Sequence, residues 1–351
     1  MTGKPRGPDL VINSTAPLRI CDLGGWTDTW FAHYGRVLNI GVAPCAEVQV
    51  EATVDHPQPG VILHVEDYND HYRLQPGKKW GKHPLLEAAV SMVSLPPDWF
   101  IEINLHCAVP PGASMGTSAA VTVALLGALK ALTPGRMPAQ EVAYAAHRVE
   151  TELLGQQCGI QDQLCAALGG LNFIEMTAYP QAIITPLSLP SDLLWELERR
   201  LSVIYLGKSH QSSHVHEMVI RGLEEAGPDS PALDDLRQMA TRGRDALFAG
   251  DLAEFGRVMT ANHEAQRRLN PGLISPLTER ISQVAGENGV LGWKVNGAGG
   301  EGGSITLLSD AHVQARRGML LKVLAKFPEC RLIPVRLDGY GLRVWQSRFK
   351  E

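Results

Sequence analysis

The chain has 351 residues, of which 44% are apolar, and its formal net charge at pH 7 is -5. This length exceeds one ordinary hydrophobic core, so we expect two domains or one large two-lobed body. The slightly acidic balance and the lack of a basic run in the sequence argue against nucleic-acid binding. The longest nearly uncharged apolar stretch, residues 119–129, is too short to span a bilayer, and residues 1–9 do not resemble a signal peptide. We expect a cytoplasmic protein with no membrane partner.

The cysteines and histidines do not form a metal or disulfide motif. None of the six cysteines stands in a Cys-x-x-Cys pair, and several lie in apolar stretches, so we expect reduced, buried thiols. His214 and His216 are two residues apart, which points them to different faces of a helix, and no His-Glu-x-x-His motif is present. Neither a zinc site nor a disulfide framework is expected.

The early part of the chain is rich in expected strands. Apolar and polar residues alternate over 37–54, with an interruption at Pro44, and again over 99–106. Residues 61–73 predict a pair of short strands around Tyr68-Asn69-Asp70. The apolar, Ala-rich run 121–132 predicts a buried helix.

The rest of the chain mixes helices and strands. Apolar residues at helical spacing predict a helix over 141–154, a Gly-bounded loop over 155–159 and a second helix over 161–168 that ends at Gly169-Gly170. Further expected elements are strands at 201–206 and 303–308, a helix that opens at Ser212-Ser213, and two or three helices within 233–287 with a turn at Gly250-Asp251.

The loop before the Ala-rich helix has the composition of a phosphate-binding site. Helix N-termini leave their first amides unpaired and carry about half a positive charge, which suits an anion. Glycine lets such a loop turn sharply and lie against phosphates. A plain turn before a core helix is the alternative. No Walker A motif is present, because Gly207-Lys208-Ser209 has Ser202 where that motif needs its first glycine. The residues assigned to ATP are Pro111, Gly112, Ala113, Ser114, Met115, Gly116, Thr117 and Ser118.

Three further motifs complete a set with this loop. They are Asp-Leu-Gly-Gly-Trp-Thr-Asp at 22–28, Gly-Ile-Gln-Asp-Gln at 159–163 and Gly-Ala-Gly-Gly-Glu-Gly-Gly at 297–303. In this order and spacing, from about Asn13 onward, the chain resembles the GHMP kinases, the superfamily of galactokinase, homoserine kinase, mevalonate kinase and phosphomevalonate kinase. The wording of the first two motifs looks most like the sugar kinases of the L-fucokinase and heptose 7-phosphate kinase branch.

The resemblance implies a fold and an activity. The expected fold is α+β, with a lobe like domain 2 of ribosomal protein S5 followed by a ferredoxin-like lobe, divided into an ATP-binding domain at 1–175 and a C-terminal domain at 176–351. The expected activity is ATP- and Mg²⁺-dependent transfer of phosphate to a hydroxyl, the anomeric one, of a sugar or sugar phosphate. A monomer or homodimer is expected.

Phosphoryl transfer needs aligned reactants, neutralised charge and an acceptor for the hydroxyl proton. Asp162 lies near the start of an expected helix, where the dipole favours a carboxylate. By itself, this position is as typical of a carboxylate that only stabilises the helix N-terminus as of a catalytic one. The resemblance makes Asp162 the catalytic aspartate, as a base or as a residue that orients the hydroxyl, and makes Arg19 the basic residue beside it.

Magnesium prefers oxygen ligands, often one or two from the protein. The family pattern places a loop hydroxyl and a glutamate there, which correspond to Thr117 or Ser118 and to Glu150. Glu152 competes, but it lies about 200° further round a helix, so only one of the two can face the nucleotide.

The substrate-binding residues implied by the resemblance are Asp22, Gly25, Trp26, Asp28, Gly299 and Gly300. Carboxylates can accept hydrogen bonds from sugar hydroxyls. The Trp26 indole can stack on a sugar face, although an ordinary packed tryptophan is the more common role of such a residue. The last motif departs from the family, because Glu301 interrupts its glycine run and Ser304 stands where a large apolar residue is common. Two other activities stay open: a non-catalytic ATP and sugar sensor, and a kinase or decarboxylase of the mevalonate pathway.

Overall fold

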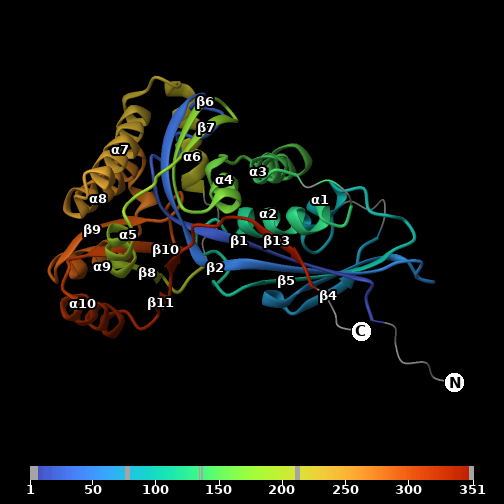
Figure 1. The fold of residues 1–351 in the computed structure, drawn as a ribbon. Coiled ribbons are helices and arrows are strands. Elements are labelled where there is room, and N and C mark those ends of the chain that lie inside the picture. The colour runs from blue at the N-terminus through green and yellow to red at the C-terminus, as the bar shows by residue number, and fades with distance from the viewer. Residues whose placement is uncertain (1–6, 76–79, 134, 136, 210–213, 348–351) are drawn as a thin grey trace.

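A computed structural model describes residues 7–75, 80–133, 135, 137–209 and 214–347. Within this part of the chain, nine strands form one sheet in which β13, β1, β2, β5, β3 and β4 are neighbours in that order (Figure 1). In addition, β6 and β12 pair with β2, and β7 pairs with β6. The strands are β1 (Leu10–Leu23), β2 (Gly35–Thr53), β3 (Gly60–Val65), β4 (Asp70–Arg73), β5 (Phe100–Cys107), β6 (Leu171–Ala178), β7 (Gln181–Pro186), β12 (Arg336–Leu337) and β13 (Arg343–Gln346).

Four helices gather on one side of this sheet in Figure 1. They are α1 (Pro84–Ser91), α2 (Thr117–Lys130), α3 (Ala139–Arg148) and α4 (Gln161–Leu168). The central helix α2 contacts both β1 and β2, and it is buried along most of its length. α3 continues into a π-helical turn, Val149–Leu153.

A second, fully antiparallel sheet has the strand order β11-β8-β10-β9. Its strands are β8 (Leu201–Tyr205), β9 (Val290–Val295), β10 (Ser304–Ser309) and β11 (Arg331–Ile333). The helices of this half are α5 (Ser191–Arg200), α6 (His214–Ala226), α7 (Pro231–Phe248), α8 (Leu252–Leu269), α9 (Pro276–Gly286) and α10 (Val313–Lys326).

The two sheets are tied together in two ways. The paired helices α7 and α8 lie between them, since α7 contacts β2 and α8 contacts β9. The chain also returns to the first sheet near its end, where β12 pairs with β2 and β13 with β1. The expected division at residue 175 stays a prediction.

Most expected elements are present, with shifted ends. The helix over 161–168 and the strands over 99–106, 201–206 and 303–308 are confirmed to within one residue. α2 begins four residues earlier than expected, because Gly116 ends the loop in a left-handed conformation, φ 71°, directly before Thr117. The helix opening expected at Ser212-Ser213 lies outside the described residues.

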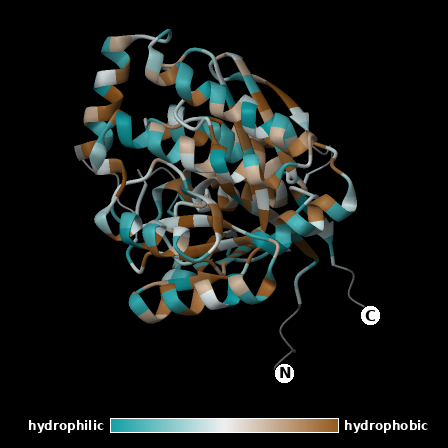
Figure 2. Ribbon diagram, turned by 90° about the vertical axis from the view of Figure 1, so that its left-hand side faces the viewer, coloured by the Kyte–Doolittle hydropathy of each residue, from teal (hydrophilic) through white to brown (hydrophobic). Residues whose placement is uncertain are grey.

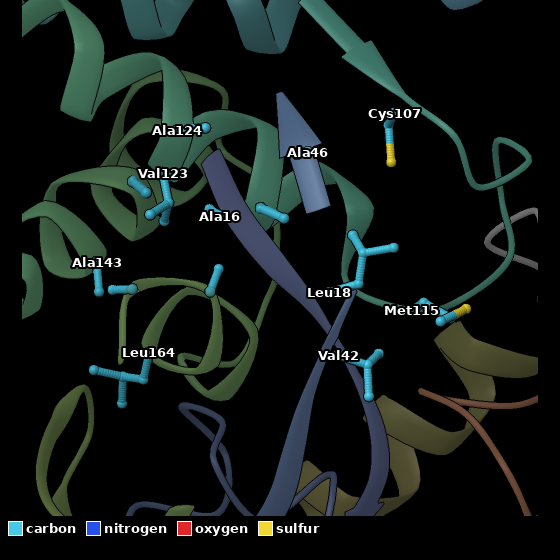
Figure 3. Packing of buried hydrophobic residues seen from close by; sticks show 14 of the residues in the cluster. Ala16, Leu18, Val42, Ala46, Cys107, Met115, Val123, Ala124, Ala143 and Leu164 are labelled. Carbon is cyan, nitrogen blue, oxygen red and sulfur yellow. The ribbon is translucent and has the colours of Figure 1, made fainter. Parts of the chain in front are cut away.

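The first sheet and its helices share one hydrophobic core. Apolar residues of β1 and β2 meet α2 and α4 in Figure 3, among them Leu18, Val42, Val123 and Leu164. Figure 2 shows the same layering. Hydrophobic segments lie toward the middle of the molecule, whereas hydrophobic and hydrophilic residues alternate along the outer helices. All six cysteines are free thiols, and five of them are buried.

No helix in the described part of the chain is both long and apolar enough to cross a bilayer.

The contact between α8 and β9 depends on two glycines. A Cβ on Gly292 would lie 1.8 Å from the carbonyl oxygen of Gly256, and one on Gly256 would lie 2.7 Å from the backbone of Leu291. Neither glycine has a positive φ. Close approach of two backbones, rather than an unusual conformation, therefore requires glycine here.

Replacing Gly292 by Ala is expected to destabilise the fold, because the added methyl group has no space and the backbones must separate. Overpacking of this kind typically costs about 1–3 kcal/mol. Thermal melting measures the loss. Gly318→Ala is the matched control, since a Cβ at this position of α10 meets nothing within 4 Å, and alanine favours a helix. A Gly292→Ala variant that melts with the wild type would contradict the prediction.

Candidate active site

A cavity of about 460 Å³ opens between the N-terminal glycine loop, the start of α2 and the start of α4. Its lining residues fall within 19–31, 112–119, 150–163, 216–220 and 297–298. All four motifs of the sequence therefore contribute to one site. A second cavity, of about 260 Å³, shares Gly112, Thr117 and Ser118 with the first and continues over a largely apolar wall.

Arg19 and Asp162 form a two-pronged ion pair at the centre of the site. The guanidinium donates from Nε to Oδ1 at 2.7 Å and from Nη2 to Oδ2 at 3.0 Å. Arg19 is buried, and its third nitrogen donates to the carbonyl of Ser114 in the phosphate loop. Burial alone would lower the pKa of Arg19, but the carboxylates of Asp162 and Asp22 outweigh it and raise the pKa. The Asp162 side chain keeps 27% of its surface exposed, so a ligand can reach it.

The carboxylate of Asp22 is held by contacts within the protein. Its Oδ1 accepts from Lys294 Nζ at 3.1 Å and from the amide of Gly297 at 3.0 Å, and lies 3.9 Å from Nη1 of Arg19. Burial raises the pKa of Asp22, but the charges of Lys294 and Arg19 outweigh burial and hold it below the usual value. Asp22 lines the cavity, and its contacts fix the last glycine loop against β1.

The phosphate loop ends at the N-terminus of α2. Gly116 is the residue before the helix, and a Cβ there would lie 3.3 Å from Asp162 Oδ2 and 3.2 Å from Arg19. The hydroxyls of Ser114 and Thr117 are buried and have no partner among the described residues. Unpaired hydroxyls beside free helix amides fit a phosphate group.

Glu150 and Glu152 lie on different faces of the helical turn, and only Glu150 faces the cavity. Glu150 is buried, lines the cavity and accepts a 2.7 Å hydrogen bond from Gln163 Nε2, whereas Glu152 is exposed and lies outside the lining. Burial raises the pKa of Glu150 to about 7, against the opposing effect of the Gln163 hydrogen bond. Glu150 with the hydroxyls of Thr117 and Ser118 gives the oxygen donors that Mg²⁺ prefers. The described residues contain no group of three or more His, Cys, Asp or Glu that could hold a metal by themselves.

Asp28 is buried at the base of the cavity and fastens the N-terminal loop to α4. Its Oδ2 accepts from the amide of Gln161 at 3.0 Å, and a Cβ on Gly159 would lie only 2.0 Å from it. Burial raises the pKa of Asp28 to about 6, only partly opposed by the Gln161 hydrogen bond.

Aromatic and apolar side chains form the wall above Asp28. The Trp26 ring stacks on His216 of α6 with centroids 5.9 Å apart and planes 18° apart. Trp30 and Phe31 pack edge to face at 5.0 Å, and both line the cavity.

Some expected site residues lie outside this cavity. Gly25 packs behind the Asp22 carboxylate, and Ala113 is buried with its carbonyl bound by Ser304. Gly299 and Gly300 lie against Leu273, whose carbonyl accepts the Gly300 amide at 2.6 Å. From the last motif, Gly297 and Ala298 line the cavity instead. Pro111 lines the second cavity.

Sequence reasoning missed several residues of the site. Gln163 belongs to the same motif as Asp162, but its hydrogen bond to Glu150, 13 residues earlier in the chain, depends on the packing of α3 on α4. Lys294 could have been identified from the sequence, because it is a lysine within an apolar strand next to a glycine motif. Nothing in the sequence brings His216 or Ile220 to residues 26–31.

Comparison with known families identifies the arrangement. The model of the GHMP kinases N terminal domain matches residues 85–170, and the model of the GHMP kinases C terminal domain matches residues 244–321. The chain therefore contains the N-terminal and C-terminal domains of the GHMP kinases. The phosphate loop, Glu150 and Asp162 fall within the first match.

Individual GHMP kinases resemble the chain over most of its length. D-glycero-alpha-D-manno-heptose 7-phosphate kinase of Campylobacter jejuni is 25% identical over 83% of this chain and 88% of its own. The bifunctional fucokinase/GDP-fucose pyrophosphorylase of Arabidopsis thaliana is 25% identical over 89% of this chain, which spans only 31% of that protein. Mevalonate kinases match as well. The structure of a D-glycero-D-manno-heptose 1-phosphate kinase from Bacteroides thetaiotaomicron has the same fold, with a TM-score of 0.72 at 20% identity over 96% of this chain and 100% of that one.

Replacing Asp28 by Asn is expected to stabilise the fold above neutral pH. The folded-state pKa of about 6 lies above the ordinary 3.8, so at pH 8 the native state holds a charge that the unfolded chain solvates better. Asparagine keeps the acceptor for the Gln161 amide without the charge. The gain in Tm should be several degrees at pH 8 and smaller at pH 5, where the native carboxyl is mostly protonated.

Scanning fluorimetry at the two pH values measures this difference. Asp98→Asn, at an exposed position in a turn, changes the net charge equally and should leave Tm nearly unaltered. A gain that is equal at pH 5 and pH 8 would rule out burial of charge as its cause.

Proposed function

We propose that this chain is an ATP-dependent sugar kinase that transfers the γ-phosphate to the anomeric hydroxyl and releases a sugar 1-phosphate. One observation carries the proposal: the Asp162 carboxylate, paired with Arg19, lies against Gly116, where the phosphate loop meets the N-terminus of α2. A proton acceptor, a fixed cation and a phosphate cradle thus meet within one cavity, which is what phosphoryl transfer requires.

The residues present fit the nucleotide and its metal. The loop 111–118 and the α2 amides would hold the phosphates, with the unpartnered hydroxyls of Ser114 and Thr117 as donors. Glu150, with Thr117 or Ser118, would hold Mg²⁺. The apolar wall of the second cavity, which includes Leu86 and Val109, suits the base.

The chain's own residues divide the reaction between them. When bound, MgATP supplies the phosphoryl group and offsets charge on its oxygens. Asp162 accepts a hydrogen bond from the acceptor hydroxyl and takes its proton as the new O–P bond forms and the bond to ADP breaks. Arg19 holds that carboxylate at two points and keeps a positive charge beside the transferred group. Asp28 and Trp26 would bind the sugar.

The alternatives are less well supported. A non-catalytic sensor has no need for the paired Arg19 and Asp162 at the phosphate loop. A mevalonate kinase or decarboxylase must bind a carboxylate substrate, and the acceptor wall around Trp26 carries Asp28 instead of a cation.

A substrate panel tests the function. ADP release is measured with L-fucose, D-arabinose, galactose, glucuronate, heptose 7-phosphate, mevalonate and homoserine, each with ATP and Mg²⁺. A phosphorus-coupled anomeric proton in the product NMR spectrum supports the proposal. Phosphate on another carbon overturns the anomeric assignment, and turnover of mevalonate or homoserine alone overturns the sugar kinase.

Asp162→Asn should lower kcat by on the order of 10² to 10⁴, because loss of a general base or orienting carboxylate typically has this effect. Asparagine keeps the shape of the side chain, so equilibrium binding of ATP should survive. Asp192→Asn serves as the control. Near wild-type turnover of Asp162→Asn would exclude the assigned role.

Glu150→Gln should raise the Mg²⁺ concentration for half-maximal activity more than Glu152→Gln does. The amide can still accept the Gln163 hydrogen bond, but it is a poor ligand for a hard cation. Titration of activity with Mg²⁺ at saturating ATP compares the two variants. Equal shifts, or a larger one for Glu152→Gln, would mean that the metal lies elsewhere.

A further inference from the structure

Two amide side chains of α8 are buried behind the candidate active site. Asn262 and Gln266 lie four residues apart, which places them on one face of the helix. Their exposed fractions are 0% and 1%. Burial of an amide is unfavourable unless its donors and acceptors find partners. Neither residue contributes to the lining of the cavity, so any influence on the reaction must pass through the residues that they bind.

These two side chains join the first glycine loop to the last one. The amide of Gly24 donates to Asn262 Oδ1 at 2.8 Å, and Asn262 Nδ2 donates to Gln266 Oε1 at 3.3 Å. Gln266 Nε2 then donates to the carbonyl of Gly297 at 3.0 Å. The amide of Gly297 returns to the first loop, where it donates to Asp22 Oδ1 at 3.0 Å. The hydrogen bonds close a ring, and we call Asn262 and Gln266 the amide bridge.

The first end of the amide bridge holds the turn that leads to the acceptor wall. While the amide of Gly24 is bound by Asn262, its carbonyl accepts from the amide of Thr27 at 3.2 Å and from the Thr27 hydroxyl at 2.8 Å. Both peptide groups of Gly24 are therefore fixed. The turn carries Trp26 and is followed by Asp28, and both of these line the cavity.

The second end of the amide bridge lies against the catalytic pair. A Cβ on Gly297 would lie 3.2 Å from Arg19 Nη2 and 3.3 Å from the carbonyl oxygen of Ser114. The backbone that Gln266 holds is thus packed on the guanidinium that binds Asp162. A displacement of this backbone would change the space around the pair.

Resting on the sugar-kinase function proposed above, we infer that Asn262 and Gln266 are positioning residues, which keep the acceptor loop 22–28 aligned with Arg19 and Asp162. Phosphoryl transfer depends on this alignment, because a misplacement of about 1 Å can lower a rate on the order of 10²-fold. Within the described residues, neither side chain of the bridge is hydrogen-bonded to the phosphate loop 111–118. The acceptor should therefore depend on the bridge more than ATP does.

Gln266→Met tests the bridge by steady-state kinetics. Methionine has a similar length but makes neither hydrogen bond. With the panel sugar that the wild type turns over fastest, KM should rise and kcat fall, so that kcat/KM drops on the order of 10²-fold. The Kd for ATP, measured by calorimetry, should stay nearly unchanged. Should Gln266→Met not fold, Asn262→Asp is measured in the same way, since it accepts from Gly24 but cannot donate to Gln266.

Thr260→Val is the matched control on the same helix. The Thr260 hydroxyl accepts from the amide of Trp293 in β9 at 3.2 Å, so its loss weakens the packing of α8 outside the bridge. This variant should lower Tm and keep the wild-type kcat/KM. A Gln266→Met variant that also loses only Tm would show a merely structural role and overturn the inference.

Hydrogen exchange tests the same coupling without a substrate. Loss of Gln266 should speed amide exchange in residues 296–303, which it binds, and also in residues 22–28, because Asn262 loses the partner that orients it. Thr260→Val should leave both segments as in the wild type. Faster exchange confined to 296–303 overturns the inference. Wild-type turnover of no panel sugar overturns the proposed function instead, and the exchange result still decides whether the bridge couples the two loops.

The double variant Asn262→Leu/Gln266→Met shows whether the two residues act as one unit. Either single change breaks the same ring, so the double variant should have nearly the kcat/KM of the worse single variant. Losses that multiply would mean that the two residues act independently, which contradicts a bridge.

Discussion

The buried guanidinium of Arg19 is the constraint on which the site depends. Arg19 belongs to β1. Its side chain binds Asp162 of α4 and the carbonyl of Ser114 in the phosphate loop. A buried guanidinium needs hydrogen-bond partners in place of water, because an unpaired buried charge is strongly unfavourable. Separation of β1, α4 and the phosphate loop would therefore leave the buried charge of Arg19 without its partners. The geometry of the candidate base thus follows from electrostatics that also hold the fold.

The neighbouring pair of Asp22 and Lys294 decides which carboxylate Arg19 prefers. Asp22 lies 3.9 Å from Arg19, whereas Asp162 lies at 2.7 Å. Because Lys294 and the amide of Gly297 already occupy Oδ1 of Asp22, the guanidinium can turn its two-pronged face to Asp162. The lysine comes from β9 of the second sheet, so the two sheets set the alignment of the site together.

The sequence predicted what local chemistry determines and missed what packing determines. Gly116 could be proposed from its place in a glycine-rich loop before a helix. A carboxylate at a helix start suggested Asp162, but its catalytic role came from the resemblance to the GHMP kinases. Helical geometry predicted only that one of Glu150 and Glu152 can face the nucleotide. The choice of Glu150 came from its spacing before Asp162 in the family pattern. By contrast, the stacking of His216 on Trp26 joins residues 190 positions apart, and no periodicity encodes it. Tertiary contacts of this kind assemble the acceptor wall.

The departure of the last motif from the family pattern has a local explanation. Ser304 Oγ donates to the carbonyl of Ala113 at 2.6 Å and accepts from Asn296 at 2.9 Å, which ties β10 to the phosphate loop. A large apolar residue could make neither bond. Glu301 is exposed and does not line the cavity. The unusual serine therefore stabilises the loop that would hold the nucleotide, and the character of the acceptor end is left to Asp28 and its aromatic neighbours.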